Sequence, residues 1–288
     1  MKSTILFLLA LLLIPMILFS APWGFFAHKK INQLAIYSVP TPFNIFLKKH
    51  SLLLQEYAVL PDERRYIMEE EAQRHYIDLD HYDLTKIKFL NLKEAESKYN
   101  KDSLSAHGIV VWHIPIAYEK LKFALAEKNI EKIIKYAAEL GHYVADAHVP
   151  LHTTSNYDGQ KTGQTGIHSF WESRIPEILN QDLEEWLGQA KYISNVQQEA
   201  WEYVLGSNVL VNKLLESEKK LSNNTAASKK YTFEQKGKTL IKTYSKEYSL
   251  AYHKLLNRSI ENRFSAAVLA VSSLWYSAWL EAGQPNLN

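Results

Sequence analysis

Hydrophobic residues recur every three or four positions over most of the chain, whereas the strict alternation typical of strands is scarce. The clearest stretch carries Ile133, Ile134, Ala137, Leu140 and Val144, which would share one face of a helix. Only 10 glycines interrupt the 288 residues, so glycine breaks few of these stretches. The pattern predicts an all-α fold with helices over Ala27–Val39, Pro42–His50, His113–Glu127, Ile130–Ala147, Gly166–Leu179, Asp182–Leu205, Leu210–Leu221, Thr232–Leu256 and Ser259–Glu281.

Polar residues mark several helix starts and the connections between helices. Thr41, Asn129 and Ser259 each stand where a helical stretch begins, and their side chains can accept a hydrogen bond from a free backbone N–H, which predicts N-caps. Long loops are predicted over Ser51–Ser105 and Thr153–Thr165. No repeat or change of composition divides the remaining chain. We therefore expect a single domain over residues 23–288.

The first residues have the features of an export signal. One lysine is followed by an apolar run from Ile5 to Phe19 and then by small residues, which predicts a signal peptide over residues 1–22. An uncleaved anchor is the alternative, although a spanning helix needs about 20 apolar residues. No later segment is long and apolar enough to cross a bilayer. We therefore expect a secreted or periplasmic protein with no transmembrane anchor after signal removal.

Charge and cysteine content narrow the possible partners and metal sites. The formal net charge is +2, which gives no strongly basic face for non-specific binding of duplex nucleic acid. Short single strands, nucleotides and lipid headgroups remain compatible with this charge. The chain has no cysteine, so disulfides and thiolate metal ligands are excluded. Metal sites would then be the only strong cross-links available to the chain.

Histidine and carboxylate residues occur at helical spacing in two places. His142 and Asp146 are four residues apart, and so are His168 and Glu172. Residues i and i+4 lie on the same face of a helix, so each pair can present two ligands in the same direction. His152 follows the first pair after a proline. Neutral imidazole and carboxylate ligands suit a hydrolytic zinc site, and the pattern predicts a metal-dependent hydrolase.

Other potential ligands are weak evidence one at a time. Trp23 and His28 lie just beyond the predicted signal peptide, Asp62 follows a proline, and His75 precedes two aspartates. A lone histidine in such a position is more often structural than ligating. We expect His81, His107 and His113 to be structural, and His148 to support ligands rather than bind metal, because it faces away from Asp146 on a continuous helix. Whether Asp78 and Asp80 orient His75 remains open.

Taken together, these residues resemble the superfamily of zinc-dependent phospholipase C and the S1/P1 nucleases. The resemblance covers residues 23–176 and rests on the order of Trp23, His28, Asp62 and His75 before the central motif. That motif reads His142-Tyr143-x-x-Asp146-x-His148-x-Pro150-x-His152-x-x-x-Asn156. It follows the phospholipase pattern, except that Ala145 stands where glycine or threonine is usual. The resemblance implies an exported all-α enzyme with a metal cleft.

The resemblance also implies two to three zinc ions per chain. One zinc would be bound by Asp62, His75, His142 and Asp146, and a second by His152, His168 and Glu172. A third would be bound by His28, by Asp146 as a bridge and by the amino nitrogen and carbonyl oxygen of an N-terminal Trp23. That third site requires a further trimming step, because Pro22 disfavours direct cleavage before Trp23. Asp62 would also be the catalytic base that aligns the attacking water.

The substrate is open between two classes of phosphodiester. The five-residue spacing of Trp23 and His28 resembles the nuclease branch, whose substrates are single-stranded nucleic acid or nucleotides. Glu172, Asn156 and the spacing between His152 and His168 resemble the phospholipase branch, which we favour slightly. A non-catalytic exported zinc-binding protein is the other alternative. No obligate protein partner is evident from the sequence.

Overall fold

The computed structural model describes residues 24–88, 90–183 and 187–287. Its first half contains α1 (Phe25–Ser38), α2 (Phe43–Lys49), α3 (Ser51–Tyr57), α4 (Leu60–Arg64), η1 (Glu69–Arg74), η2 (Leu79–His81), α5 (Leu84–Ile87), α6 (Leu92–Tyr99), α7 (Lys101–His107), α8 (Val110–Ala126) and α9 (Ile130–Ala147). Its second half contains η3 (Pro150–Thr153), α10 (Ile167–Ser169), η4 (Phe170–Arg174), α11 (Ile175–Ile178), η5 (Asn180–Leu183), α12 (Val196–Asn208), α13 (Val211–Asn223), α14 (Ala227–Lys230), β1 (Tyr231–Lys236), β2 (Thr239–Tyr244), α15 (Lys246–Leu256) and α16 (Ser259–Glu281). The predicted all-α class is confirmed.

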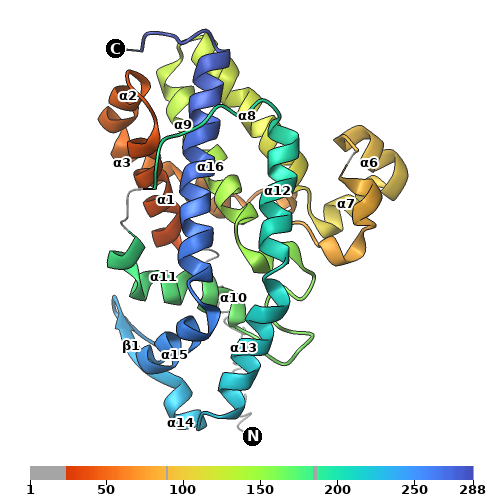
Figure 1. Ribbon diagram of the computed structural model, residues 1–288, viewed down its shortest axis with the longest axis vertical. Coiled ribbons are helices and arrows are strands. Elements are labelled where there is room, and N and C mark those ends of the chain that lie inside the picture. Colours follow the sequence, from red (N-terminus) through yellow and green to blue (C-terminus); the bar gives the residue numbers. More distant parts are fainter. Residues whose placement is uncertain (1–23, 89, 184–186, 288) are drawn as a thin grey trace, which may run out of the picture.

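Long helices form the body of the molecule (Figure 1). Helix α9 packs against α8 and α16, and α1 and α12 pack against the same group. The buried hydrophobic residues form one cluster between these helices. Within it, the indole Nε1 of Trp275 donates to the Ala137 carbonyl at 2.9 Å and fixes α16 against α9. Helices α6 and α7 lie to one side of this body (Figure 1).

Helix α9 forms as its sequence predicts. The Asn129 side chain accepts a hydrogen bond from the Lys132 backbone N–H at 3.1 Å, which confirms the predicted N-cap. The predicted apolar face, from Ile133 to Val144, is buried. Towards its end the helix is buried on every side, from Ala137 to Ala147. The metal-ligating residues predicted on this helix therefore lie in the interior.

Several predicted boundaries are wrong. The predicted loop Ser51–Ser105 contains short helices from α3 to α7. These helices were not predicted because they have few apolar residues at helical spacing. The predicted helix Asp182–Leu205 begins only at Val196. Thr41 does not cap α2, which begins at Phe43 after Pro42, and Ser259 is the first residue of α16 rather than its cap.

The predicted helix Thr232–Leu256 is also wrong over its first half. Residues 231–244 form the antiparallel hairpin β1–β2, in which Lys236 pairs with Thr239. Gly237 supplies the left-handed turn between them, with φ of 61°. Only the second half is helical, as α15.

The export predictions fall on a part of the chain that the structure leaves undescribed. Signal peptide 1–22 and Trp23 both lie outside the described residues. Among the helices of the described segments, none combines the length and the hydropathy that crossing a bilayer requires.

Candidate metal centre

Side chains from distant parts of the chain meet beside the end of α9. They come from α1, α4, the end of η1, α9, η3, α10 and η4. We call this group the histidine–carboxylate cluster; its described members are His28, Asp62, His75, His142, Asp146, His152, His168 and Glu172. All of them are buried except His168, whose side chain is 18% exposed. Trp23, the remaining predicted ligand, lies outside the described residues.

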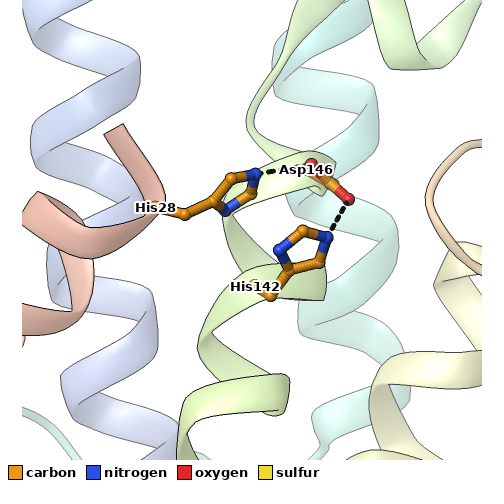
Figure 2. A group of neighbouring side chains, drawn as sticks. All are labelled: His28, His142 and Asp146. Atoms are coloured by element: carbon orange, nitrogen blue, oxygen red, sulfur yellow. Dashed lines mark ion pairs between the residues drawn. The ribbon is translucent and has the colours of Figure 1, made fainter. Parts of the chain in front are cut away.

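Asp146 lies at the centre of the cluster. Its Oδ2 is 3.2 Å from Nε2 of His142, one turn earlier on α9, and 2.9 Å from Nδ1 of His75. Its Oδ1 is 3.5 Å from Nε2 of His28, whose ring stacks on that of His142 at 3.9 Å (Figure 2). Asp146 Oδ1 is also 3.8 Å from Nδ1 of His152. One carboxylate thus links side chains from four segments.

A first group of possible ligands combines Asp62, His75 and His142. Nδ1 of His75 is 3.0 Å from Nε2 of His142. Oδ1 of Asp62 is 3.7 Å from that His75 nitrogen and 3.8 Å from that His142 nitrogen. Ligand atoms on a tetrahedral zinc ion are separated by about 3.3 Å, so this spacing is suited to a shared cation.

A second group combines His152, His168 and Glu172. Oε2 of Glu172 is 2.9 Å from Nε2 of His168 and 3.3 Å from Nε2 of His152, and the two histidine nitrogens are 3.1 Å apart. Glu172 lies in η4, a single π-helical turn that follows the short helix α10. Such turns re-aim side chains within a helical segment and are frequent at functional sites.

Backbone carbonyls orient the histidines of the cluster. Nδ1 of His142 donates to the Ala58 carbonyl at 2.8 Å, and Nδ1 of His152 donates to the His75 carbonyl at 2.7 Å. Nδ1 of His168 donates to the Tyr157 carbonyl at 3.2 Å. In each case Nε2 is left facing the cluster. This is the arrangement by which proteins fix the tautomer of a metal-binding histidine.

The model of the S1/P1 nuclease family matches residues 27–263. The chain belongs to this family. The family is named for nucleases, which are hydrolases that act on phosphoric ester bonds, and the superfamily inferred from the sequence motifs is confirmed.

The fold of this S1/P1 nuclease family member is similar to that of a solved toxin structure. A crystal structure of alpha-toxin from an avian strain of Clostridium perfringens matches with a TM-score of 0.56 and 13% sequence identity. The match covers 93% of this chain but only 65% of the toxin chain. Likeness at this identity shows the fold alone. No curated protein matches the chain.

The electrostatics of the cluster fit a divalent cation. Both carboxylate oxygens of Asp62 and Oδ1 of Asp146 are buried and make no hydrogen bond to the described residues. Burying a carboxylate without such partners is costly unless a cation compensates its charge. The nitrogen and oxygen donors are those that zinc prefers when thiolates are absent. The described residues therefore fit a zinc ion.

Shifted pKa values reflect this crowding of charge. Burial raises the pKa of Asp62, although His142 and His75 act in the opposite direction. Burial alone would raise the pKa of Asp146, but His142 and His152 hold it well below its ordinary value. Burial would lower the pKa of His152, but Asp146 and Glu172 raise it to about 9. Since zinc binds neutral imidazole, cation binding at His152 would release a proton.

A second group of charged residues, centred on Glu71, lies behind His75 and was not predicted from the sequence. Oε1 of Glu71 is 3.7 Å from Nε2 of His75 and accepts a short hydrogen bond from Tyr143. Arg64 and Arg74 also bond to the Glu71 carboxylate. Burial would raise the pKa of Glu71, but His75, Tyr143 and Arg64 hold it well below its ordinary value. The spacing of Glu71 and His75, four residues apart, was the signal that could have revealed this contact.

Other histidines and aspartates lie outside the cluster. His148 donates from Nδ1 to the Val144 carbonyl at 2.7 Å. Asp78 bonds to His107 rather than to His75, and Asp80 accepts from Ser155.

Proposed function

We propose that the protein is a zinc-dependent phosphodiesterase whose histidine–carboxylate cluster binds two to three zinc ions. Asp62, His75, His142 and Asp146 would bind one, and His152, His168 and Glu172 a second. His28 and Asp146 would contribute to a third, together with Trp23. The proposal rests chiefly on the position of Asp146, which lies close to members of all three groups. Zinc ions bound to groups that adjoin in this way would lie close together. Membership of the S1/P1 nuclease family supports this reading.

Zinc bound in such a cluster supplies an activated water and neutralises charge on a phosphodiester. The chain's own residues would then position the ions and move protons. Asp62 is the proposed general base, because the resemblance of the sequence motifs implies that its carboxylate aligns the attacking water. Arg65, 3.6 Å from Asp62 Oδ1 and partly exposed, would hold this carboxylate in place.

We propose single-stranded nucleic acid or nucleotides as the substrate. The family membership supports this, and so do exposed aromatic side chains beside the cluster. Tyr157 is 53% exposed, and its ring centre lies 6.1 Å from that of His168. Phe25 is 38% exposed and precedes His28 by less than one helical turn. Nucleic-acid bases stack on such rings without strong sequence preference.

A phospholipid headgroup is the second candidate. The sequence motif around Asn156 and Glu172 supports it, and this motif carried the preference drawn from the sequence. We also propose that the protein is exported, on the strength of the signal-like pattern over residues 1–22.

A paired assay tests the proposal. Zinc-replete protein is incubated with a single-stranded oligonucleotide and, separately, with phosphatidylcholine vesicles, each with and without a chelator. We expect chelator-sensitive cleavage of the oligonucleotide, reduced about 10²- to 10⁴-fold in an Asp62→Asn variant. Asp102→Asn, at an exposed position, is the matched control and should keep full activity.

Two outcomes would count against parts of the proposal. If phosphatidylcholine alone is hydrolysed, the proposed phosphodiesterase activity stands and the proposed nucleic-acid substrate is refuted. Bound zinc without hydrolysis of either substrate would favour the non-catalytic zinc-binding alternative.

A further inference from the structure

A separate group of potential metal ligands lies outside the cluster. Asp78, His81 and His107 each offer one ligand atom, and these atoms lie within 4.8 Å of one another. Nδ1 of His107 is 3.1 Å from Oδ2 of Asp78. The rings of His81 and His107 stack at 3.7 Å with an angle of 18°. We call these three residues the peripheral triad. None of them is a predicted ligand of the histidine–carboxylate cluster.

The peripheral triad repeats the local arrangement found at His28, His142 and Asp146. There too, two imidazoles stack, at 3.9 Å and 18°, beside one aspartate (Figure 2). The two groups differ in exposure, because Asp78 is buried while His81 is exposed and His107 is partly exposed. Solvent can therefore complete the coordination of an ion at the peripheral triad, whereas the other group is enclosed.

The backbone holds the triad in place. The Asp78 N–H donates to the His107 carbonyl at 2.8 Å, and the Val110 N–H donates to the Tyr76 carbonyl at 3.2 Å. Gly108 permits this close approach, since its φ is 82° and a Cβ there would lie 2.1 Å from the Tyr76 oxygen. The ligands thus stand on fixed segments, as a preorganised metal site requires.

A bound cation would also compensate the negative charge of the buried Asp78 carboxylate. Burial raises the pKa of this carboxyl, although the hydrogen bond from His107 acts in the opposite direction. Neighbouring Asp80 adds further negative charge. A divalent cation would compensate a charge that a single neutral imidazole compensates poorly.

We propose that Asp78, His81 and His107 form a zinc site that is distinct from the histidine–carboxylate cluster. Two nitrogens and one oxygen favour zinc or a similar transition metal over magnesium or calcium. Such an ion would join η2 to the end of α7 and so help to fasten α6 and α7, which lie to one side of the helical body (Figure 1). In a chain without cysteine, this is a cross-link that a disulfide cannot supply.

The site also adjoins the segment that supports the catalytic cluster. His75 and Asp78 are separated by two residues, and the Ile77 N–H between them donates to the His152 carbonyl at 2.9 Å. Zinc at the peripheral triad would therefore help to hold the backbone that positions His75 and His152. Its role would be structural, and the proposal does not depend on catalysis.

Zinc content and stability test the proposal. Wild-type protein, His81→Ala and the control His50→Ala are dialysed against the same micromolar zinc, and bound zinc is counted by mass spectrometry. We expect His81→Ala to lose one zinc per chain relative to the other two proteins. Its affinity at this site should fall by about 100-fold or more, since even a lost partner of a ligand weakens metal binding 10- to 100-fold. Asp78→Asn should lose the same zinc.

Thermal unfolding supplies a second readout that excludes misfolding. In chelator, wild type and His81→Ala should unfold at the same temperature, because His81 is exposed. In zinc, the unfolding temperature of the wild type should rise more than that of His81→Ala. Amide exchange over residues 84–107 should become slower only in the wild type. Equal zinc content and equal exchange in the two proteins would overturn the proposal. A His142→Ala variant should keep the peripheral zinc, which separates this test from that of the catalytic cluster.

Discussion

Replacing Gly141 by alanine should separate two helices that carry the histidine–carboxylate cluster. Gly141 precedes His142 on α9 and faces Asn32 on α1, where a Cβ would lie 2.0 Å from the Asn32 Oδ1. The Asn32 amide is buried and donates to the carbonyls of Leu54 and Ala138, each at 3.1 Å. The side chain that would have to move therefore joins α1, α3 and α9.

The expected cost can be worked out from these contacts. Replacing glycine by alanine inside a helix ordinarily raises the free energy of unfolding by about 0.5–1 kcal/mol. Overpacking a fixed interior costs about 1–3 kcal/mol, and the two hydrogen bonds of Asn32 are worth about 1 kcal/mol each. The net loss for Gly141→Ala should be about 2–4 kcal/mol. Movement of α1 would also open the stack of His28 on His142, so zinc content should fall.

Urea unfolding and zinc analysis of the variant check this reasoning. Gly206→Ala is the matched control, because this glycine is also helical, in α12, and its Cβ would meet only the end of the Arg263 side chain at 3.1 Å. That control should change stability by less than about 1 kcal/mol. In an Asn32→Ala background, Gly141→Ala should cost much less, because the clash is gone. A Gly141→Ala protein as stable as the wild type would refute the reasoning.

Three further predictions concern the surroundings of the cluster. Glu71→Gln should lower the free energy of unfolding by about 3 kcal/mol in urea titrations, since two arginines and Tyr143 lose their charged partner, while exposed Glu70→Gln should have no such effect. His113 is buried with a pKa lowered by that burial to about 3, so its stabilising contribution is complete above the ordinary value of 6.5 and is lost as the pH falls towards 3. Between pH 6 and 5 the wild type should therefore lose about 1 kcal/mol more than His113→Phe, and equal pH slopes in the two proteins would contradict the assigned shift. A chelator should lower the thermal midpoint of the wild type and added zinc should restore it, whereas an unchanged midpoint would show that the cluster contributes no metal-dependent stability.

The fold class could be predicted because α-helical periodicity runs through the longest elements. Helix α9 has both an N-cap at Asn129 and a regular apolar face, so its bounds were found. The short helices between residues 51 and 107 bury only isolated residues such as Leu54, Ala95 and Leu104, and so leave no periodic pattern. In the hairpin, the strand signal was the aromatic and β-branched content on either side of Gly237, which a reading based on helical spacing overlooked.

The candidate metal centre was predictable where ligands are close in sequence. The spacing of His142 and Asp146, and of His168 and Glu172, fixes which side chains share a helical face. Asp62 and His75 carry no such local signal, and they reached the prediction only through the order of the family's motifs. Glu71 was missed although its spacing from His75 offered a local signal, whereas the contacts of the peripheral triad depend on how η2 and α7 pack, which spacing alone does not specify.

Crystals of the zinc-replete protein, measured on both sides of the zinc absorption edge, test the central claim most directly. Anomalous difference density should show at least two peaks, one between Asp62, His75 and His142 and one between His152, His168 and Glu172. Both should disappear after soaking in chelator. A zinc-replete crystal with no anomalous peak beside Asp146 would contradict the account.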